Sequence, residues 1–107
     1  MLPKKNRADT KEVEKIFKDG RFLNSSNLTF KFILTKDSPI SRISVVVPKT
    51  VSKKAVERNK LRRLGYFALQ KHIDNSTSLL GVFVFKKYQD DISTIENEIQ
   101  SILNKVN

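Results

Sequence analysis

The central stretch of the chain, residues 49–73, reads KTVSKKAVERNKLRRLGYFALQKHI. It holds eight lysines and arginines against the single acid Glu57, a net charge of +7 out of +10 for the whole chain. Apolar residues recur in it at helical spacing. The pattern predicts a helix that begins at Ser52 as its N-cap and runs to about Ile73. This helix is the element around which we expect the rest of the chain to fold.

The expected helix has an apolar side and a basic side. At about 100° per residue, the apolar side collects residues that we expect to enter the core: Val56, Leu61, Leu64, Phe67 and Ala68. Lys54, Arg58 and Arg62 follow one another at four-residue spacing on the basic side. Like charges at that spacing repel by roughly 0.2–0.5 kcal/mol per pair. A helix that accumulates them is suited to a polyanion, although a solvated basic face is the simpler alternative.

The order of residues on the basic side favours phosphate binding over simple solvation. Arg58 and Asn59 are followed by Arg62 and Arg63, which places guanidinium groups beside an amide. Guanidinium forks bind phosphate oxygens in pairs, and amides can reach base edges. The high positive charge of the chain also indicates a polyanionic partner, with nucleic acid as the first candidate.

Outward from this helix, the sequence predicts three strands. Residues 28–34 alternate, with Leu28, Phe30, Phe32 and Leu34 on the core side. The next strand, 43–47, is expected to pair with the first as an antiparallel hairpin. Residues 79–85 are apolar on both faces, as in a central, covered strand. A strand–helix–strand order makes 43–47 and 79–85 parallel, and residues 21–27 are expected to form a turn.

Two further helices complete the expected fold. One spans residues 10–19, and the last follows Asp90 and Asp91 with an isoleucine-rich stripe. Residues 89–107 carry four acids and one lysine, so this last helix is expected to cover the core and not to contact RNA. The prediction is an α+β fold, a small two-layer α/β sandwich with the order α-β-β-α-β-α and room for one further strand. Residues 1–107 are expected to form a single domain, with residues 1–8 as a flexible basic arm.

Composition excludes most enzyme classes. The chain has one histidine, no cysteine and three unclustered glycines, so nucleophilic triads, thiolate metal sites and glycine-rich phosphate loops are absent. Asp90 and Asp91 fit a helix cap better than a metal site. The start of the chain has charge without an apolar region, and the longest apolar run, 79–85, is far shorter than a membrane span. We therefore expect a cytoplasmic protein with no membrane contact and no catalytic or metal site of its own.

The segment from Lys53 to Arg63 reads KKAVERNKLRR. It resembles the Arg-Asn signature of the bacterial ribonuclease P protein component, and the order of the other elements agrees along nearly the whole chain. The chain departs from the family pattern at Gly65 and Tyr66, where a further arginine is usual three positions after the arginine pair. The resemblance implies an unusual left-handed β-α-β crossover.

The resemblance also implies a function. The family protein is the protein subunit of an endoribonuclease whose catalyst is an RNA, and which removes the 5′ leader of precursor transfer RNA. The implied partners are the catalytic RNA and precursor transfer RNA, with no obligate protein partner. The implied metal is Mg²⁺, held by the RNA and the substrate.

Carried over by position, the resemblance assigns two sets of residues. The RNA-binding set comprises Lys49, Lys53, Lys54, Arg58, Asn59, Lys60, Arg62 and Arg63. The leader-binding set, expected in a cleft between the first helix and the sheet, comprises Val13, Phe17, Thr29 and Lys31. Phe17 is the only ring in the second set.

Two other functions compete with this one. Another small basic RNA-binding protein, such as a ribosomal protein, would explain the charge and the arginines but not the matching order of elements. An autonomous nuclease would need the carboxylate cluster that the sequence lacks.

Overall fold

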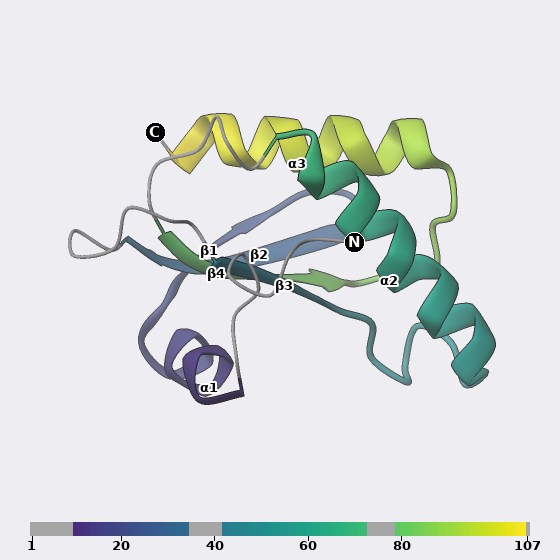
Figure 1. Ribbon diagram of the computed structural model, residues 1–107, viewed down its shortest axis with the longest axis horizontal. Helices are drawn as coiled ribbons and strands as arrows, with labels where there is room; N and C mark the ends of the chain where they lie inside the picture. Colours follow the sequence, from purple (N-terminus) through teal and green to yellow (C-terminus); the bar gives the residue numbers. More distant parts are fainter. Residues whose placement is uncertain (1–9, 35–41, 73–78, 107) are drawn as a thin grey trace.

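The computed structural model describes residues 10–34, 42–72 and 79–106, so the basic arm expected at residues 1–8 lies outside the described part. Within these residues, three helices and four strands follow one another in the order α-β-β-β-α-β-α (Figure 1). Their bounds are α1 Thr10–Asp19, β1 Arg21–Asn24, β2 Leu28–Leu34, β3 Arg42–Val46, α2 Ala55–Gln70, β4 Leu79–Phe85 and α3 Ile92–Val106. The mixed α+β class predicted from the sequence is confirmed.

The strands form one sheet in the order β1-β2-β4-β3. β3 and β4 are parallel, as predicted, but the predicted hairpin between β2 and β3 is wrong, because β4 lies between them and pairs antiparallel with β2. β4 is apolar on both faces, and the central position gives it a strand partner on each side and cover above and below. The left-handed crossover stays a prediction.

β1 corrects a second expectation. The sequence predicts a turn at residues 21–27, yet residues 21–24 pair antiparallel with β2 from Arg21–Phe32 to Asn24–Thr29. β1 is therefore the further strand for which the predicted order left room. Its side chains are mostly exposed, as at a sheet edge, and so the segment lacks the apolar alternation that would reveal a strand.

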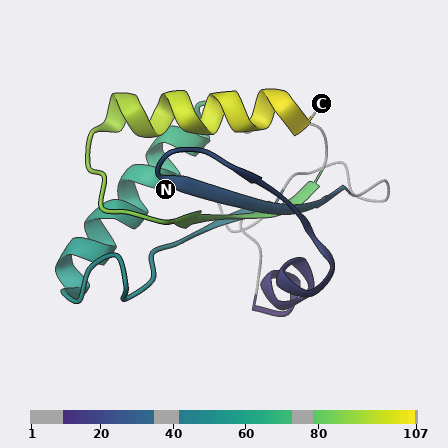
Figure 2. The same ribbon diagram turned by 180° about the vertical axis from the view of Figure 1, so that it is seen from behind.

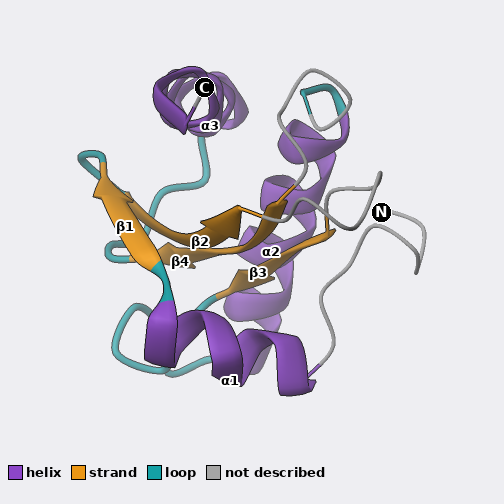
Figure 3. Cartoon of the chain, turned by 90° about the vertical axis from the view of Figure 1, so that its left-hand side faces the viewer, coloured by secondary structure: helices purple, strands orange, loops and turns teal. Residues whose placement is uncertain are grey.

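The main core lies between the sheet and the layer formed by α2 and α3 (Figures 1 and 2). Phe30 stacks on Phe32 and on Phe83, with ring centroids 5.3 and 4.2 Å apart. Leu28, Phe30 and Phe32 are buried as predicted, whereas Leu34, also predicted to be in the core, is 48% exposed at the end of β2. α1 packs against β2 and β4 on the opposite face of the sheet (Figure 3).

α2 is shorter than predicted. Its N-cap is Lys54, without a side-chain cap, and it ends at Gln70. The expected end at Ile73 lies outside the described residues. Ser52, the predicted N-cap, stands before the helix, where its hydroxyl donates a 2.8 Å hydrogen bond to the carboxylate of Glu57. Ser52 thus ties the approaching loop to the first turn without capping it.

The buried side of α2 also differs from the prediction. Val56 and Phe67, expected in the core, are 78% and 51% exposed. Leu61 and Ala68 are buried as predicted, and Gly65, Tyr66 and Leu69 complete the buried stripe of the helix. A Cβ at Gly65 would lie 2.9 Å from Val45 Cγ1 of β3, so glycine is what allows α2 to approach the sheet this closely.

α3 follows its prediction. Asp91 caps it by accepting hydrogen bonds from the backbone N–H of Ser93 at 3.2 Å and the hydroxyl of Thr94 at 2.9 Å. The expected stripe is buried through Ile95, Ile99, Ile102 and Leu103. No helix among the described residues has the length and apolar character needed to cross a membrane.

Glu98 of α3 holds the turn between β1 and β2. Its carboxylate accepts hydrogen bonds from the hydroxyl of Ser25 and from the backbone and side-chain nitrogens of Asn27, the latter two at 2.7 Å. Burial tends to raise the pKa of Glu98, but these hydrogen bonds and the charge of Lys86 outweigh burial and hold that pKa below its ordinary value of 4.5. The charged carboxylate therefore stabilises the folded chain.

This contact predicts a pH-dependent stability. Because the folded-state pKa of Glu98 is lowered, its contribution is complete above about pH 4.5 and is lost as the pH falls through the folded-state pKa. We expect Glu98→Gln to lower the free energy of unfolding by about 1–3 kcal/mol at pH 7, and the loss to shrink in acid. Denaturant melts at several pH values measure this. Glu96→Gln is the control, since its surface ion pair with Lys71 is worth about 0–1 kcal/mol. A loss at Glu98 that is constant from pH 7 to pH 3 would contradict the prediction.

Candidate nucleic-acid interface

The predicted RNA-binding set lies on α2 and on the loop before it. Lys49, Lys53 and Lys54 are exposed on that loop, and five residues of the set follow on the helix. The lysines come to this surface because the chain leaves β3 at the sheet edge and must travel to the start of α2. The helix then presents its residues at successive 100° steps, so they do not all face one direction.

Two members of the set are engaged within the protein. The Arg58 guanidinium donates a 3.0 Å hydrogen bond to the backbone carbonyl of Ser52, which holds it against the loop. Lys60 Nζ lies 3.3 Å from the Asp90 carboxylate, and both side chains are about half exposed. The charge of Lys60 is therefore partly neutralised, and Arg58 contributes to the start of the helix.

Three members of the set come together. Asn59, Arg62 and Arg63 line one hollow of about 370 Å³ with Val56 and Tyr66. All three are exposed. Two guanidinium groups and an amide around one hollow can bind phosphate oxygens and base edges.

Phe17 and Lys31 of the predicted leader-binding set are in contact on the α1 face of the sheet. Lys31 Nζ lies 4.9 Å from the centroid of the Phe17 ring, a cation–π distance. Phe17 is 44% exposed, which excludes the alternative that it belongs to the core. Val13, one turn earlier on α1, is half-buried. Ile16 is the residue that anchors α1, since it is fully buried.

Thr29 and Phe22 extend this face along the sheet. The Thr29 hydroxyl donates a 2.7 Å hydrogen bond to the side-chain oxygen of Asn24. Phe22 is the cross-strand partner of Lys31 and is 62% exposed. The sequence prediction missed Phe22, because it assigns residues 21–27 to a turn. The signal that could have found it is the strand-like spacing of Phe22 and Asn24, which places both on one face.

The structure does not bring the two predicted sets into one site. Lys31 and Val82 pair across β2 and β4 on the α1 face, whereas the buried side of α2 belongs to the core on the other face. Figure 3 shows α1 and α3 on opposite sides of the sheet, with α2 beside β3. The protein therefore offers two surfaces: a basic one on α2 and a mixed aromatic and cationic one on α1, β1 and β2.

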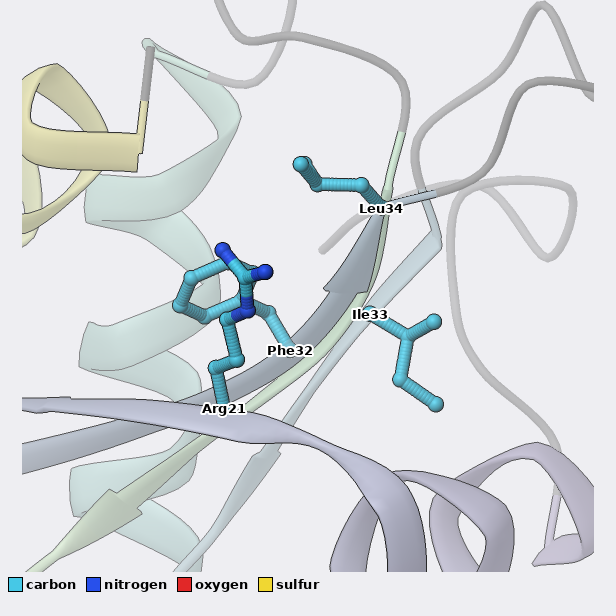
Figure 4. Close-up of a pocket in the computed structure, with 4 residues that line it drawn as sticks. All are labelled: Arg21, Phe32, Ile33 and Leu34. Carbon is cyan, nitrogen blue, oxygen red and sulfur yellow. The ribbon is translucent and has the colours of Figure 1, made fainter.

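A further hollow, of about 230 Å³, lies at the start of β1 and the end of β2. Figure 4 shows its lining, with Arg21 and Phe32 on one side of β2 and Ile33 on the other. Leu34 completes it. It contains no residue of either predicted set, and we assign it no role.

Possible metal ligands do not cluster in the described part of the chain. Among residues 10–34, 42–72 and 79–106, no three histidine, cysteine, aspartate or glutamate side chains gather in a way that could hold a metal ion. Asp90 and Asp91, which the sequence presents as a pair, are used separately, one by Lys60 and the other as the cap of α3.

Comparison with known proteins identifies the family. The family model of Ribonuclease P matches residues 2–107. The ribonuclease P protein component of Borrelia turicatae (strain 91E135) is 30% identical over 95 residues, covering 89% of this chain and 82% of that protein. The component of Prochlorococcus marinus (strain AS9601) is 36% identical over 94 residues, covering 83% and 72%.

Solved structures agree on the fold. The ribonuclease P protein of Staphylococcus aureus superposes with a TM-score of 0.82 at 16% identity, covering 98% of this chain and 97% of that one. The protein from Thermotoga maritima gives a TM-score of 0.82 at 21% identity, covering 94% and 97%. The family match over almost the whole length, together with this shared fold, shows that the chain belongs to the ribonuclease P protein family.

Proposed function

We propose that this chain is the protein subunit of a ribonuclease P that removes the 5′ leader of precursor transfer RNA. The chain binds the catalytic RNA through the basic surface of α2 and its preceding loop. The observation that carries the proposal is the convergence of Asn59, Arg62 and Arg63 on one exposed hollow, in a chain of this family. These three side chains of the RNA-binding set lie together and face solvent.

The leader is proposed to run along the α1 face of the sheet. Phe17 offers an exposed ring, and Lys31 beside it offers a positive charge. A single strand needs both, since bases stack on rings and the phosphate chain follows positive charge. Phe22 and Thr29 prolong this surface toward β1.

Mg²⁺ is proposed to be held by the RNA and its substrate. In support of this, no three histidine, cysteine, aspartate or glutamate side chains gather among the described residues in a way that could hold an ion. The contribution of this chain is to neutralise phosphates, which lowers the repulsion that an RNA complex must overcome, and to position the substrate.

The proposal predicts that cleavage requires RNA. Incubated with precursor transfer RNA and Mg²⁺, the protein freed of RNA is expected to release no leader, because its sequence has one histidine and no cysteine and its described residues gather no metal-binding cluster. With a bacterial ribonuclease P RNA added, the same protein is expected to raise the rate of leader release, measured on gels at low Mg²⁺.

The outcomes separate the competing functions. Cleavage at the mature 5′ end by the RNA-free protein would identify an autonomous nuclease. RNA binding without any stimulation of the ribonuclease P RNA would favour another basic RNA-binding protein. Either outcome contradicts the proposal.

A further inference from the structure

The basic helix α2 carries an apolar surface that the core does not use. Val56 and Phe67 are 78% and 51% exposed, although each is large and apolar. They stand on the outward side of α2, in the same helical segment as Arg62 and Arg63. Exposed apolar side chains within a basic surface indicate a partner that is charged and also has flat apolar parts.

This surface is hollowed at two adjacent places. The first hollow, of about 370 Å³, lies toward the start of the helix and is bounded by Val56. The second, of about 350 Å³, is bounded by Leu64 and Phe67. Arg63 and Tyr66 line both hollows, so the two follow one another along the helix with an arginine between them.

The rings that bound the hollows are held in place. The hydroxyl of Tyr66 accepts a 3.2 Å hydrogen bond from the backbone N–H of Val45 on the edge strand β3, which fixes its ring against the sheet. Lys71 Nζ lies 4.9 Å from the centroid of the Phe67 ring and 2.7 Å from the Glu96 carboxylate. A surface whose rings are already ordered loses less conformational freedom on binding.

We propose that the two hollows of α2 take two unpaired bases of the RNA partner, one against Val56 and Tyr66 and one against Phe67. Arg63, between them, binds the phosphate that links the two nucleotides. This inference rests on the proposed RNA-binding function and adds a mode of recognition to it. The helix then recognises a place where the RNA is single-stranded, because only unpaired bases can leave the stack and enter a protein hollow.

An anionic membrane is the other partner with charge and apolar parts, and the structure disfavours it. Membrane-surface helices insert a continuous apolar face. On α2 the continuous apolar face, formed by Leu61, Ala68 and Leu69 with Gly65 and Tyr66, is buried in the core. The outward side offers only separate apolar residues with arginines between them, which suits single bases and not a lipid layer.

The test compares a ligand with bases to a ligand without them. Val56→Ser and Phe67→Ser are made in the full chain, and binding is measured to a bacterial ribonuclease P RNA and, separately, to inorganic polyphosphate. Stacking of one base on the Phe67 ring predicts a five- to hundredfold loss of affinity for the RNA in Phe67→Ser. Val56→Ser is expected to cause a smaller loss, because Val56 has no ring and Tyr66 remains in its hollow. Affinity for polyphosphate and the salt dependence of RNA binding are expected to stay unchanged, since neither substitution alters charge. Leu34→Ser, at a 48% exposed leucine outside this surface, is the matched control.

Each other outcome overturns the inference in a distinguishable way. If wild-type protein fails to bind the RNA, the proposed function itself is wrong. If the wild type binds the RNA and both variants bind it with the wild-type affinity, the hollows take no bases. Equal losses for RNA and polyphosphate would mean that the substitutions disturb the helix, and a melting curve for each variant checks this directly. If Phe67→Ser weakens binding to phosphatidylserine vesicles and leaves RNA binding unaffected, the partner of this surface is a membrane and not RNA.

Discussion

Replacing Phe17 with alanine is expected to weaken binding of precursor transfer RNA to the holoenzyme five- to hundredfold and to leave mature transfer RNA unaffected. Stacking of a base on an aromatic ring is worth roughly 1–3 kcal/mol. Mature transfer RNA has no leader, so it makes no such contact and loses no affinity. Phe17 is 44% exposed, so its removal should cost little stability. The measurement is the ratio of dissociation constants for the two ligands at matched folded fraction.

Phe22 should behave in the same way, because it stands across the strand pair from Lys31 and is 62% exposed. The double variant Phe17→Ala, Phe22→Ala is expected to lose more than either single variant. If one leader nucleotide stacks on each ring, the losses multiply; if both rings hold one nucleotide, the second substitution adds little. Leaders of increasing length distinguish these two cases.

A matched control is available in Tyr88. It is an exposed ring of similar accessibility, 42%, placed after β4 beside Asp90 and away from α1. Tyr88→Ala should leave the ratio for precursor and mature transfer RNA unchanged. Equal losses of both ligands in Phe17→Ala would show that this ring supports the fold or the catalytic RNA, and not the leader.

Two features of the sheet were not predicted from the sequence, for different physical reasons. Strands 28–34 and 42–46 are neighbours in sequence, which favours a hairpin, yet β4 separates them. The apolar run Leu79–Phe85 already indicated this arrangement, because its two apolar faces require cover and its edges require partners on both sides. The edge strand β1 carries no such signal, because Arg21 and Asn24 are exposed and polar.

The position of the helices in sequence was predictable, but the rotation of α2 was not. Helical spacing places Val56 and Phe67 inside because they are large and apolar. The helix instead turns Gly65 toward the sheet, where the missing side chain allows close packing on Val45. Hydrophobicity alone ranks glycine low, and the gain from a close approach depends on the partner strand, which a single sequence does not show.

The same distinction applies to the functional residues. The basic set could be named from its charge and spacing, since exposed residues need no partner to be recognised. The sequence could not show which of these cations remain available to a partner. Lys60 is paired with Asp90, thirty residues later, and Arg58 donates a hydrogen bond to the carbonyl of Ser52. Phe22 was missed because the sequence prediction assigned residues 21–27, which include β1, to a turn.

These pairings predict unequal effects of removing charge. Arg62→Gln with Arg63→Gln should weaken RNA binding strongly. The slope of log K against log salt should fall by about 0.9 for each phosphate that is no longer neutralised in a duplex-like region, and by less in single strands. Both side chains are exposed on α2 and so can turn toward a phosphate. Titrations at several salt concentrations measure affinity and slope together.

Lys60→Gln is the matched control, with the same change of charge per residue on the same helix. Because Lys60 must leave Asp90 to reach phosphate, its removal is expected to change the slope less than that of either arginine. Arg58→Gln should lower both affinity and stability, since it also removes the hydrogen bond to Ser52. Asn59→Ala should lower affinity with little change of slope, because an amide displaces no counterion. Equal slopes for the wild type and the double arginine variant would show that this face of α2 does not bind phosphate.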